Sequence, residues 1–178
     1  RYQRRSRQSR DCRRHVDRLN RPDIENAAYA VIENQTGAVR ALGSVSRSSS
    51  GDGWLNGATV HRSCGSTLKP FLYLAGIQRR IMTAATVFPD TADAVREVYA
   101  DYDPHNFVRK HAGPVRLREA LGSSLNVPAV VALGMVGARS VHEVCMEWGI
   151  RFSAPLKDSG AGFILGNGGV TLIDLPCH

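Results

Sequence analysis

Two strand-like stretches joined by a polar turn set the first constraint on how this chain folds. Residues 27–33 and 38–44 are rich in alanine, valine and other aliphatic residues, and the turn between them ends in Gly37. Glycine readily takes the positive φ that tight turns between antiparallel strands require. The pattern therefore predicts a β-hairpin at the start of a folded body.

Helical patterns follow the hairpin. An apolar stripe that includes Leu68, Phe71 and Leu72 predicts a helix from residue 65 to about residue 79. Further helices are predicted over residues 114–121, from residue 126 onward and over residues 141–148. Residues 44–52 and 160–169 are rich in serine or glycine and predict loops, whereas residues 82–113 predict an irregular stretch.

The positive charge is confined to one end of the sequence. Residues 1–21 hold nine arginines and two aspartates, which equals the whole net charge of +7, so the remaining residues are neutral as a group. A nucleic-acid-binding domain carries its basic residues on a face of the folded body, so this distribution argues against a nucleic-acid partner. We predict a basic helix or linker over residues 1–22, followed by a domain over residues 23–178.

The sequence offers little support for a metal centre, a cofactor or a membrane anchor. The four cysteines show no Cys-x-x-Cys spacing, and three of them lie three residues from a histidine. Such pairs bind zinc only if the fold gathers two of them, and we expect neither a metal nor a cofactor. The longest apolar stretch, residues 127–136, is shorter than the roughly 20 residues of a membrane-spanning helix.

Ser66 and Lys69 form the first candidate catalytic pair. Residues three apart lie on one face of a helix, so the Ser66 hydroxyl and the Lys69 amine can meet. A serine hydroxyl needs a base to take its proton, and lysine serves as that base only when it is neutral. Partial burial at the start of a helix would lower the pKa of Lys69 in the required direction, and the amides there can bind an oxyanion.

Ser124 and Asn126 form a second candidate pair, at a predicted break between two helices. A Ser-x-Asn turn can direct a hydroxyl and an amide into a cleft, where Ser124 relays a proton and Asn126 holds a lysine or a substrate carbonyl. Serine and asparagine also favour turns and helix N-caps, so a purely structural role stays open.

Both pairs, with their flanking residues, resemble the transpeptidase domain of penicillin-binding proteins. Residues 62–73 (RSCGSTLKPFLY) are similar to the family's active-serine region, and residues 118–130 contain its second motif, Ser-Leu-Asn. Residues 27–44 resemble the family's opening hairpin, and residues 165–172 resemble its next landmark. The resemblance covers residues 24–175 and is closest to the class A branch, in particular the 1C subgroup, where a glycosyltransferase domain precedes the transpeptidase.

This resemblance implies a fold and a set of roles. The fold would be α/β, or α+β in the stricter sense, with an antiparallel sheet flanked by helices as in serine β-lactamases. Ser66 would attack the D-Ala-D-Ala bond of a peptidoglycan stem peptide with Lys69 as its base. Ser124 would pass a proton to the leaving group, and Asn126 would bind the substrate amide and steady Lys69. β-Lactam antibiotics would acylate the same serine, at the periplasmic face of the inner membrane to which the parent protein is anchored.

The sequence departs from the family's pattern at three places. No Lys-Thr-Gly motif follows Lys110, Cys64 stands where the family usually has proline, and residues 175–178 leave the expected helical continuation. We therefore expect a domain that is incomplete at its C-terminal end. Two alternatives to a transpeptidase stay open: a hydrolytic relative (a D,D-carboxypeptidase, β-lactamase or β-lactam sensor), and an inactive remnant that acts as a basic-tailed binding module.

Overall fold

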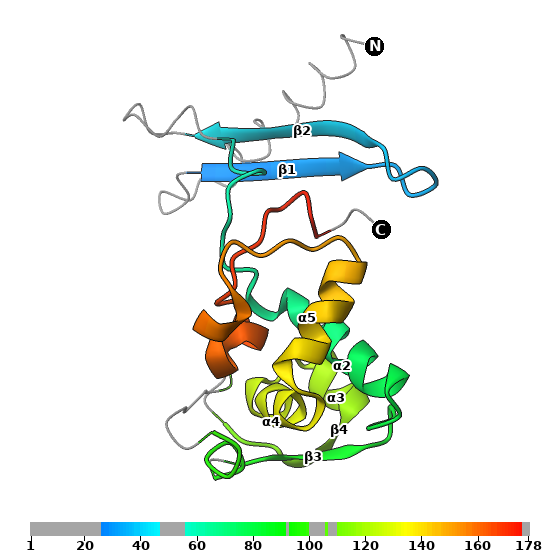
Figure 1. Ribbon diagram of the computed structural model, residues 1–178, viewed down its shortest axis with the longest axis vertical. Coiled ribbons are helices and arrows are strands. Elements are labelled where there is room, and N and C mark those ends of the chain that lie inside the picture. The colour runs from blue at the N-terminus through cyan, green and yellow to red at the C-terminus, as the bar shows by residue number, and fades with distance from the viewer. Residues whose placement is uncertain (1–25, 47–55, 92, 100–105, 107–109, 176–178) are drawn as a thin grey trace. The chain divides into compact units, whose positions relative to one another are not determined.

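The computed structural model describes residues 26–46, 56–91, 93–99, 106 and 110–175. These residues belong to two compact units, which Figure 1 shows as ribbons. The first unit contains the predicted hairpin and residues 170–175, and the second extends from Ser63 to Gly169. The predicted basic helix or linker, Cys12, Cys177 and most of the predicted loop at residues 44–52 lie outside the described residues.

The hairpin of the first unit confirms the sequence prediction. Strands β1 (Asn26–Ile32) and β2 (Val39–Ser46) pair antiparallel, with Ala30 opposite Leu42 and Tyr29 opposite Gly43. At the turn, Gly37 has a φ of 66° and its N–H donates to the carbonyl of Glu33 at 2.9 Å. The same unit contains an antiparallel bridge in which Arg62 and Val170 exchange backbone hydrogen bonds of 2.8 and 2.9 Å.

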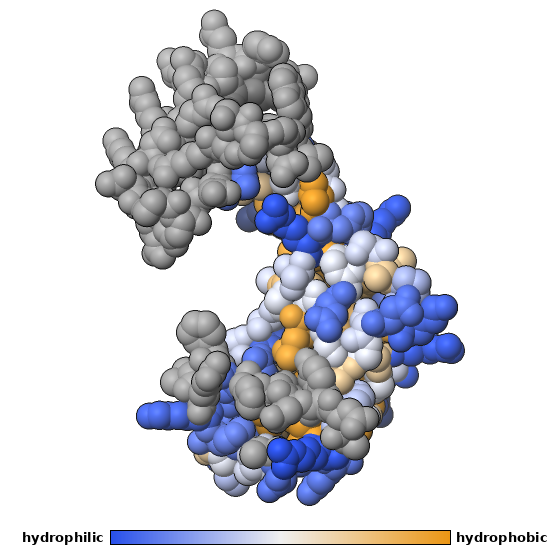
Figure 2. Space-filling model, turned by 90° about the vertical axis from the view of Figure 1, so that its left-hand side faces the viewer, coloured by the Kyte–Doolittle hydropathy of each residue, from blue (hydrophilic) through white to orange (hydrophobic). Residues whose placement is uncertain are grey.

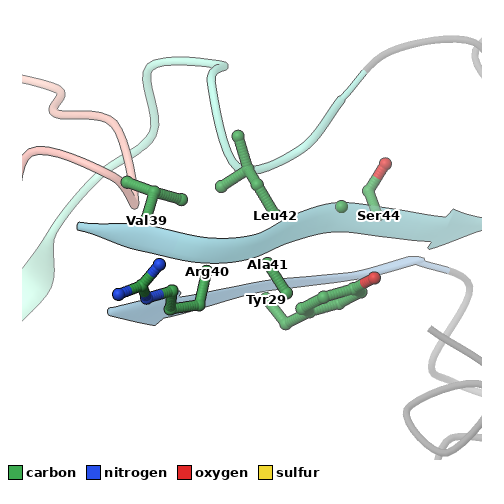
Figure 3. Close-up of a pocket in the computed structure, with 7 residues that line it drawn as sticks. Tyr29, Val39, Arg40, Ala41, Leu42 and Ser44 are labelled. Atoms are coloured by element: carbon green, nitrogen blue, oxygen red, sulfur yellow. The ribbon is translucent and has the colours of Figure 1, made fainter. Parts of the chain in front are cut away.

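A pocket of about 350 Å³ lies on this hairpin. Figure 3 shows its lining, which consists of Tyr29 from β1 and residues 39–44 from β2. The Tyr29 ring lies across Gly43, where an added Cβ would come within 2.9 Å of the phenolic oxygen. None of the four predicted catalytic or binding residues lines this pocket.

Helix α4 (Asn126–Val136) forms the core of the second unit and is apolar on all sides. It packs against α2 (Lys69–Gln78), α5 (Ala138–Glu147), strand β3 (Val87–Asp90) and the 3-10 helix η4 (Gly160–Leu165). Figure 1 shows α4 among the other helices of this unit, with β3 and β4 (Gly113–Arg116) beside them. Most α4 side chains are buried, which explains why its sequence shows no polar face.

The remaining elements correct several sequence predictions. Residues 114–116, predicted as the start of a helix, belong to β4, and helix α3 covers only Leu117–Gly122. Residues 87–90, predicted as irregular, form β3 and pair with β4. Helix α5 begins at Ala138, three residues before the predicted start, because Gly137 at a φ of 83° ends α4 there. The predicted glycine-rich loop contains η4.

Polar side chains dominate the surface of the described residues in the view of Figure 2, and they separate the apolar side chains into small patches. Within the described parts of the chain, no single helix has the length and apolar character needed to cross a membrane. Helices α4 and α5 meet that requirement only as a pair bent by 94°.

Candidate active site

Lys69 lies where a short 3-10 helix, η2 (Gly65–Leu68), continues into helix α2. Its backbone N–H donates to the carbonyl of Ser66, which connects the two predicted catalytic residues through the main chain. Leu68 and Leu72 on either side are fully buried. Burial of this apolar stripe carries Lys69 into the interior as well, and only 1% of the lysine is exposed.

The Lys69 amine meets both residues of the second candidate pair. Its Nζ donates to the carbonyl oxygen of Ser124 at 2.6 Å, to Oδ1 of Asn126 at 2.7 Å and to Oγ of Ser124 at 3.2 Å. A protonated lysine has three N–H donors, and these contacts supply three acceptors. All three acceptors are neutral groups, and no carboxylate contacts Lys69 within the part of the chain that the structure describes.

This environment favours the neutral amine. Burial lowers the pKa of Lys69 from its ordinary value of 10.5 to about 8. Taking an ammonium out of water disfavours the charged form, and no opposite charge among the described residues compensates for it. At pH 7 roughly a tenth of the molecules then hold an unprotonated amine, a far larger fraction than an exposed lysine provides.

Ser124 takes its position from the way helix α3 ends. The N–H of Ser124 donates to the carbonyl of Leu121 at 3.0 Å, and the N–H of Leu125 donates to the carbonyl of Ala120 at 2.9 Å. These two bonds form a Schellman motif, whose left-handed position is usually glycine. Ser124 occupies that position with a φ of 51°, and its carbonyl faces the Lys69 amine. A strained residue is thus held where it contacts the lysine.

This strain gives a prediction about two variants that both lack the hydroxyl. We expect Ser124→Gly to be more stable than Ser124→Ala by about 1 kcal/mol, because only the alanine variant keeps a Cβ in the left-handed region. Denaturant unfolding of the two proteins measures the difference directly. An alanine variant at least as stable as the glycine variant would show that residue 124 is not left-handed in solution.

Ser66 is exposed on η2, whereas Lys69 is buried. The side chain of Ser66 makes no hydrogen bond to Lys69, Ser124 or Asn126 in the structure as described. The structure therefore brings three of the four predicted residues into direct contact and places Ser66, the predicted nucleophile, on the exposed 3-10 helix that precedes α2. An exposed hydroxyl is accessible to a substrate from solution.

Sequence reasoning missed two buried polar residues near this site, Asp90 and Asn106. Asn106 contacts Asp90 through its Nδ2 at 2.8 and 3.0 Å, and its Oδ1 accepts the backbone N–H of Asn126 at 2.8 Å. Both lie in the stretch that was predicted to be irregular, where aspartate and asparagine are common in loops. The only local signal was the end of an apolar run at Phe88.

The other residues that the sequence singles out lie apart from the contacts of Lys69 or outside the described residues. His61 and His142 each lie three residues from a cysteine, but no group of three or more metal-ligating side chains occurs within the described ranges. The His142 ring stacks on Phe152 with ring centres 5.0 Å apart. Trp54, Tyr102 and Phe107, aromatic side chains of the kind that can line a substrate groove, lie outside the described residues.

Comparison with known proteins identifies the family. A sequence model described as "Penicillin binding protein transpeptidase domain" matches residues 27–161, which is most of the chain. The chain belongs to this transpeptidase family. The resemblance inferred from the Ser66 and Ser124 motifs is therefore confirmed.

Class A penicillin-binding proteins are among the curated relatives. Penicillin-binding protein 1A of Escherichia coli K12 is 35% identical over 131 residues, which cover 72% of this chain and 15% of the relative. Penicillin-binding protein 1C of the same organism is 31% identical over 156 residues, which cover 86% of this chain and 18% of the relative. The chain thus spans less than a fifth of the length of either relative.

Solved structures of this family share the fold. Penicillin-binding protein 1A from Haemophilus influenzae superposes with a TM-score of 0.69 at 26% identity, over 84% of this chain and 22% of that protein. PonA1 from Mycobacterium tuberculosis, solved in complex with penicillin V, gives 0.69 at 22% identity, over 88% of this chain and 43% of that one. The predicted α/β class is confirmed, with helices and small antiparallel sheets in the penicillin-binding transpeptidase arrangement.

Proposed function

We propose that this chain carries the acyl-transfer site of a D,D-transpeptidase that cross-links peptidoglycan. Ser66 attacks the carbonyl of the D-Ala-D-Ala bond in a stem peptide and forms an acyl-enzyme. An amine from a neighbouring stem peptide then resolves the acyl-enzyme and makes the cross-link. The family supplies the substrate class, and the observation that carries the proposal is the Lys69 amine, buried against Ser124 and Asn126 without an acidic partner in the described structure.

The hydrogen bonds of the Lys69 amine are compatible with the role of a base. A neutral lysine has two N–H donors and one lone pair, so it can keep its bonds to the Ser124 carbonyl and to Asn126 Oδ1. The lone pair is then available to accept the Ser66 proton as the hydroxyl oxygen bonds to the substrate carbonyl carbon. In the proposed reaction Ser124 Oγ passes that proton on to the leaving D-alanine nitrogen, and its distance of 3.2 Å from Nζ supports this role.

The same family membership supports the wider setting of the proposal. We place the transpeptidase domain at residues 23–178, behind a basic helix or linker, within a parent protein that is anchored at the periplasmic face of the bacterial inner membrane. In that parent protein we propose that a glycosyltransferase domain precedes it, as the resemblance to the class A branch implies. β-Lactam antibiotics act as substrate mimics at Ser66.

Labelling with a fluorescent penicillin tests the proposed nucleophile. The 178-residue chain should form a covalent adduct that resists denaturation, and Ser66→Ala should form none because the attacking oxygen is gone. Ser63→Ala, which removes a nearby hydroxyl, serves as the matched control and should retain labelling. Equal labelling of the Ser66→Ala and unaltered chains would refute Ser66 as nucleophile. If the unaltered chain itself took up no label, that result would refute acylation by penicillin in this chain.

The lifetime of the adduct separates a transpeptidase from a hydrolytic relative. A transpeptidase releases penicillin slowly, because its acyl-enzyme reacts with an amine acceptor and only slowly with water. A chase with unlabelled penicillin followed over hours measures this lifetime. Rapid loss of the fluorescent label would favour a carboxypeptidase or β-lactamase.

A further inference from the structure

Helix α4 begins without a capping side chain of its own. Its N-cap residue is Leu125, which provides no side-chain hydrogen bond. The first N–H groups of an α-helix have no partner within the helix, and leaving them unpaired in the interior is costly. The missing acceptor comes from Asn106. Its Oδ1 accepts the N–H of Asn126 at 2.8 Å and the N–H of Val127 at 3.4 Å.

Asp90 determines which way the Asn106 amide faces. The Nδ2 of Asn106 donates to both carboxylate oxygens of Asp90 and, at 3.0 Å, to the carbonyl of Lys110. Carboxylate and carbonyl oxygens only accept hydrogen bonds, so the amide oxygen of Asn106 must face the opposite side, toward α4. Asp90 is fully buried, and its Oδ2 also accepts the N–H of Ala112 at 2.8 Å. The partly exposed His111 ring lies 3.5 Å from the other oxygen.

The resulting chain of bonds ends at the candidate catalytic amine. Asn106 binds the backbone N–H of Asn126, and Lys69 binds its Oδ1 at 2.7 Å, so these contacts connect the start of α4 to the amine. Asn106 is 4% exposed and Asp90 is 0% exposed, so water does not compete for these bonds. Buried polar networks whose members are satisfied hold one arrangement of the groups they connect.

We propose that Asp90 and Asn106 are positioning residues for acyl transfer. Together they hold the first turn of α4, and with it Asn126 and Ser124, against the Lys69 amine. Their action is indirect, through the Asn126 backbone. The inference rests on the proposed function, because it assigns Lys69 the role of base.

Asn106→Ala tests this role with two separate measurements. Acylation by penicillin per folded molecule should fall about 10²-fold, the order expected when catalytic groups move by about 1 Å. The pKa of Lys69 should rise from about 8 toward 10.5, because loosening of the first turn of α4 admits water to the amine. The chain has only three lysines, Lys69, Lys110 and Lys157, so NMR of ¹³C-labelled lysine resolves this titration, and Lys69→Met identifies its signal.

A charge swap tests the geometry of the pair. Asn106→Asp brings two carboxylates together, and Asp90→Asn turns an N–H group toward the donors of Asn106 and Ala112. In the double variant, the new amide at position 90 donates to the new carboxylate at position 106, whose other oxygen still accepts from α4. The Lys110 carbonyl loses its donor in the double variant and in Asn106→Asp alike, so these two proteins are the matched pair. The double variant should acylate about tenfold faster than Asn106→Asp, in keeping with the coupling of contacting residues. A double variant no faster than Asn106→Asp would overturn the proposal.

Val141→Ala is the matched control, since it removes methyl groups from the buried face of α5 and no hydrogen bond. It should lower the melting temperature while leaving the Lys69 titration unchanged. An unchanged titration in folded Asn106→Ala, or an equal shift in Val141→Ala, would overturn the positioning role. Because the titration needs no penicillin, it tests whether Asn106 holds the surroundings of Lys69 even if the chain is not acylated and the proposed function fails.

Discussion

Lys69→Met is expected to slow the acylation of Ser66 by penicillin by roughly 10²–10⁴-fold, which is the usual contribution of a general base. Methionine fills a similar volume but cannot accept the serine proton. In the unaltered chain, the acylation rate should rise about tenfold per pH unit below the Lys69 pKa of about 8 and level off above it, because only the neutral amine is a base. Rapid-quench labelling from about pH 6 to about pH 10 measures both effects.

Lys69→Arg distinguishes a base from a fixed positive charge. A guanidinium can still donate to the Ser124 carbonyl and to Asn126, but it stays protonated at every accessible pH. If Lys69 acts as the base, the arginine variant should be as slow as Lys69→Met throughout the pH range. Substantial activity of Lys69→Arg, or a wild-type rate that falls as the pH rises through about 8, would show instead that the ammonium acts electrostatically.

The hairpin could be predicted because its determinants are local. Its two strands and the turn at Gly37 lie within about twenty consecutive residues, and the observed bounds differ from the predicted ones by only one or two positions. The turn is fixed by its own side chains, since Arg40 contacts the Glu33 carboxylate at 2.6 Å and Thr36 donates to the same oxygen. Such short-range pairing is readable from residue types alone.

The contact of Lys69 with Ser124 and Asn126 was predictable only through family resemblance. Ser124 and Asn126 follow Lys69 by 55 and 57 positions, and neither short motif determines where the other lies in the fold. The left-handed conformation of Ser124 was not predicted, because serine lacks the freedom that marks glycine at such positions. This conformation follows from the end of α3 at Gly122, and the sequence predicted that end only approximately.

Strands β3 and β4 were missed because local preference opposes them. Pro89 and Pro114 face each other across the pair, and proline cannot donate to a strand ladder. The strands form nonetheless, since they bury Phe88 and Val115 against the helical core. The same tertiary packing brings Asp90, at the end of β3, to Asn106, and no local pattern indicates that contact.

Gly166→Ala is expected to have the largest effect on the folded state. Gly166 ends η4 with a φ of 105°, and a Cβ there would lie 2.4 Å from the backbone nitrogen of Gly65 and 2.5 Å from Ser63 Oγ. Conformational strain and overpacking together should destabilise the protein by about 2–5 kcal/mol. The clash falls on the backbone next to Ser66, so acylation of the molecules that remain folded should also decrease.

Gly160→Ala isolates the contribution of the clash. Gly160 has a φ of 51° at the other end of η4, but an added Cβ would meet no atom within 4 Å. Its alanine variant should therefore lose only about 1–2 kcal/mol, from backbone strain alone, and should keep its acylation rate. Denaturant unfolding and penicillin labelling of both variants provide the comparison. Equal losses would show that Gly166 matters only for its φ, whereas a larger loss in Gly166→Ala, with slowed acylation, would show that close packing of η4 on Gly65 holds the nucleophile's turn in place.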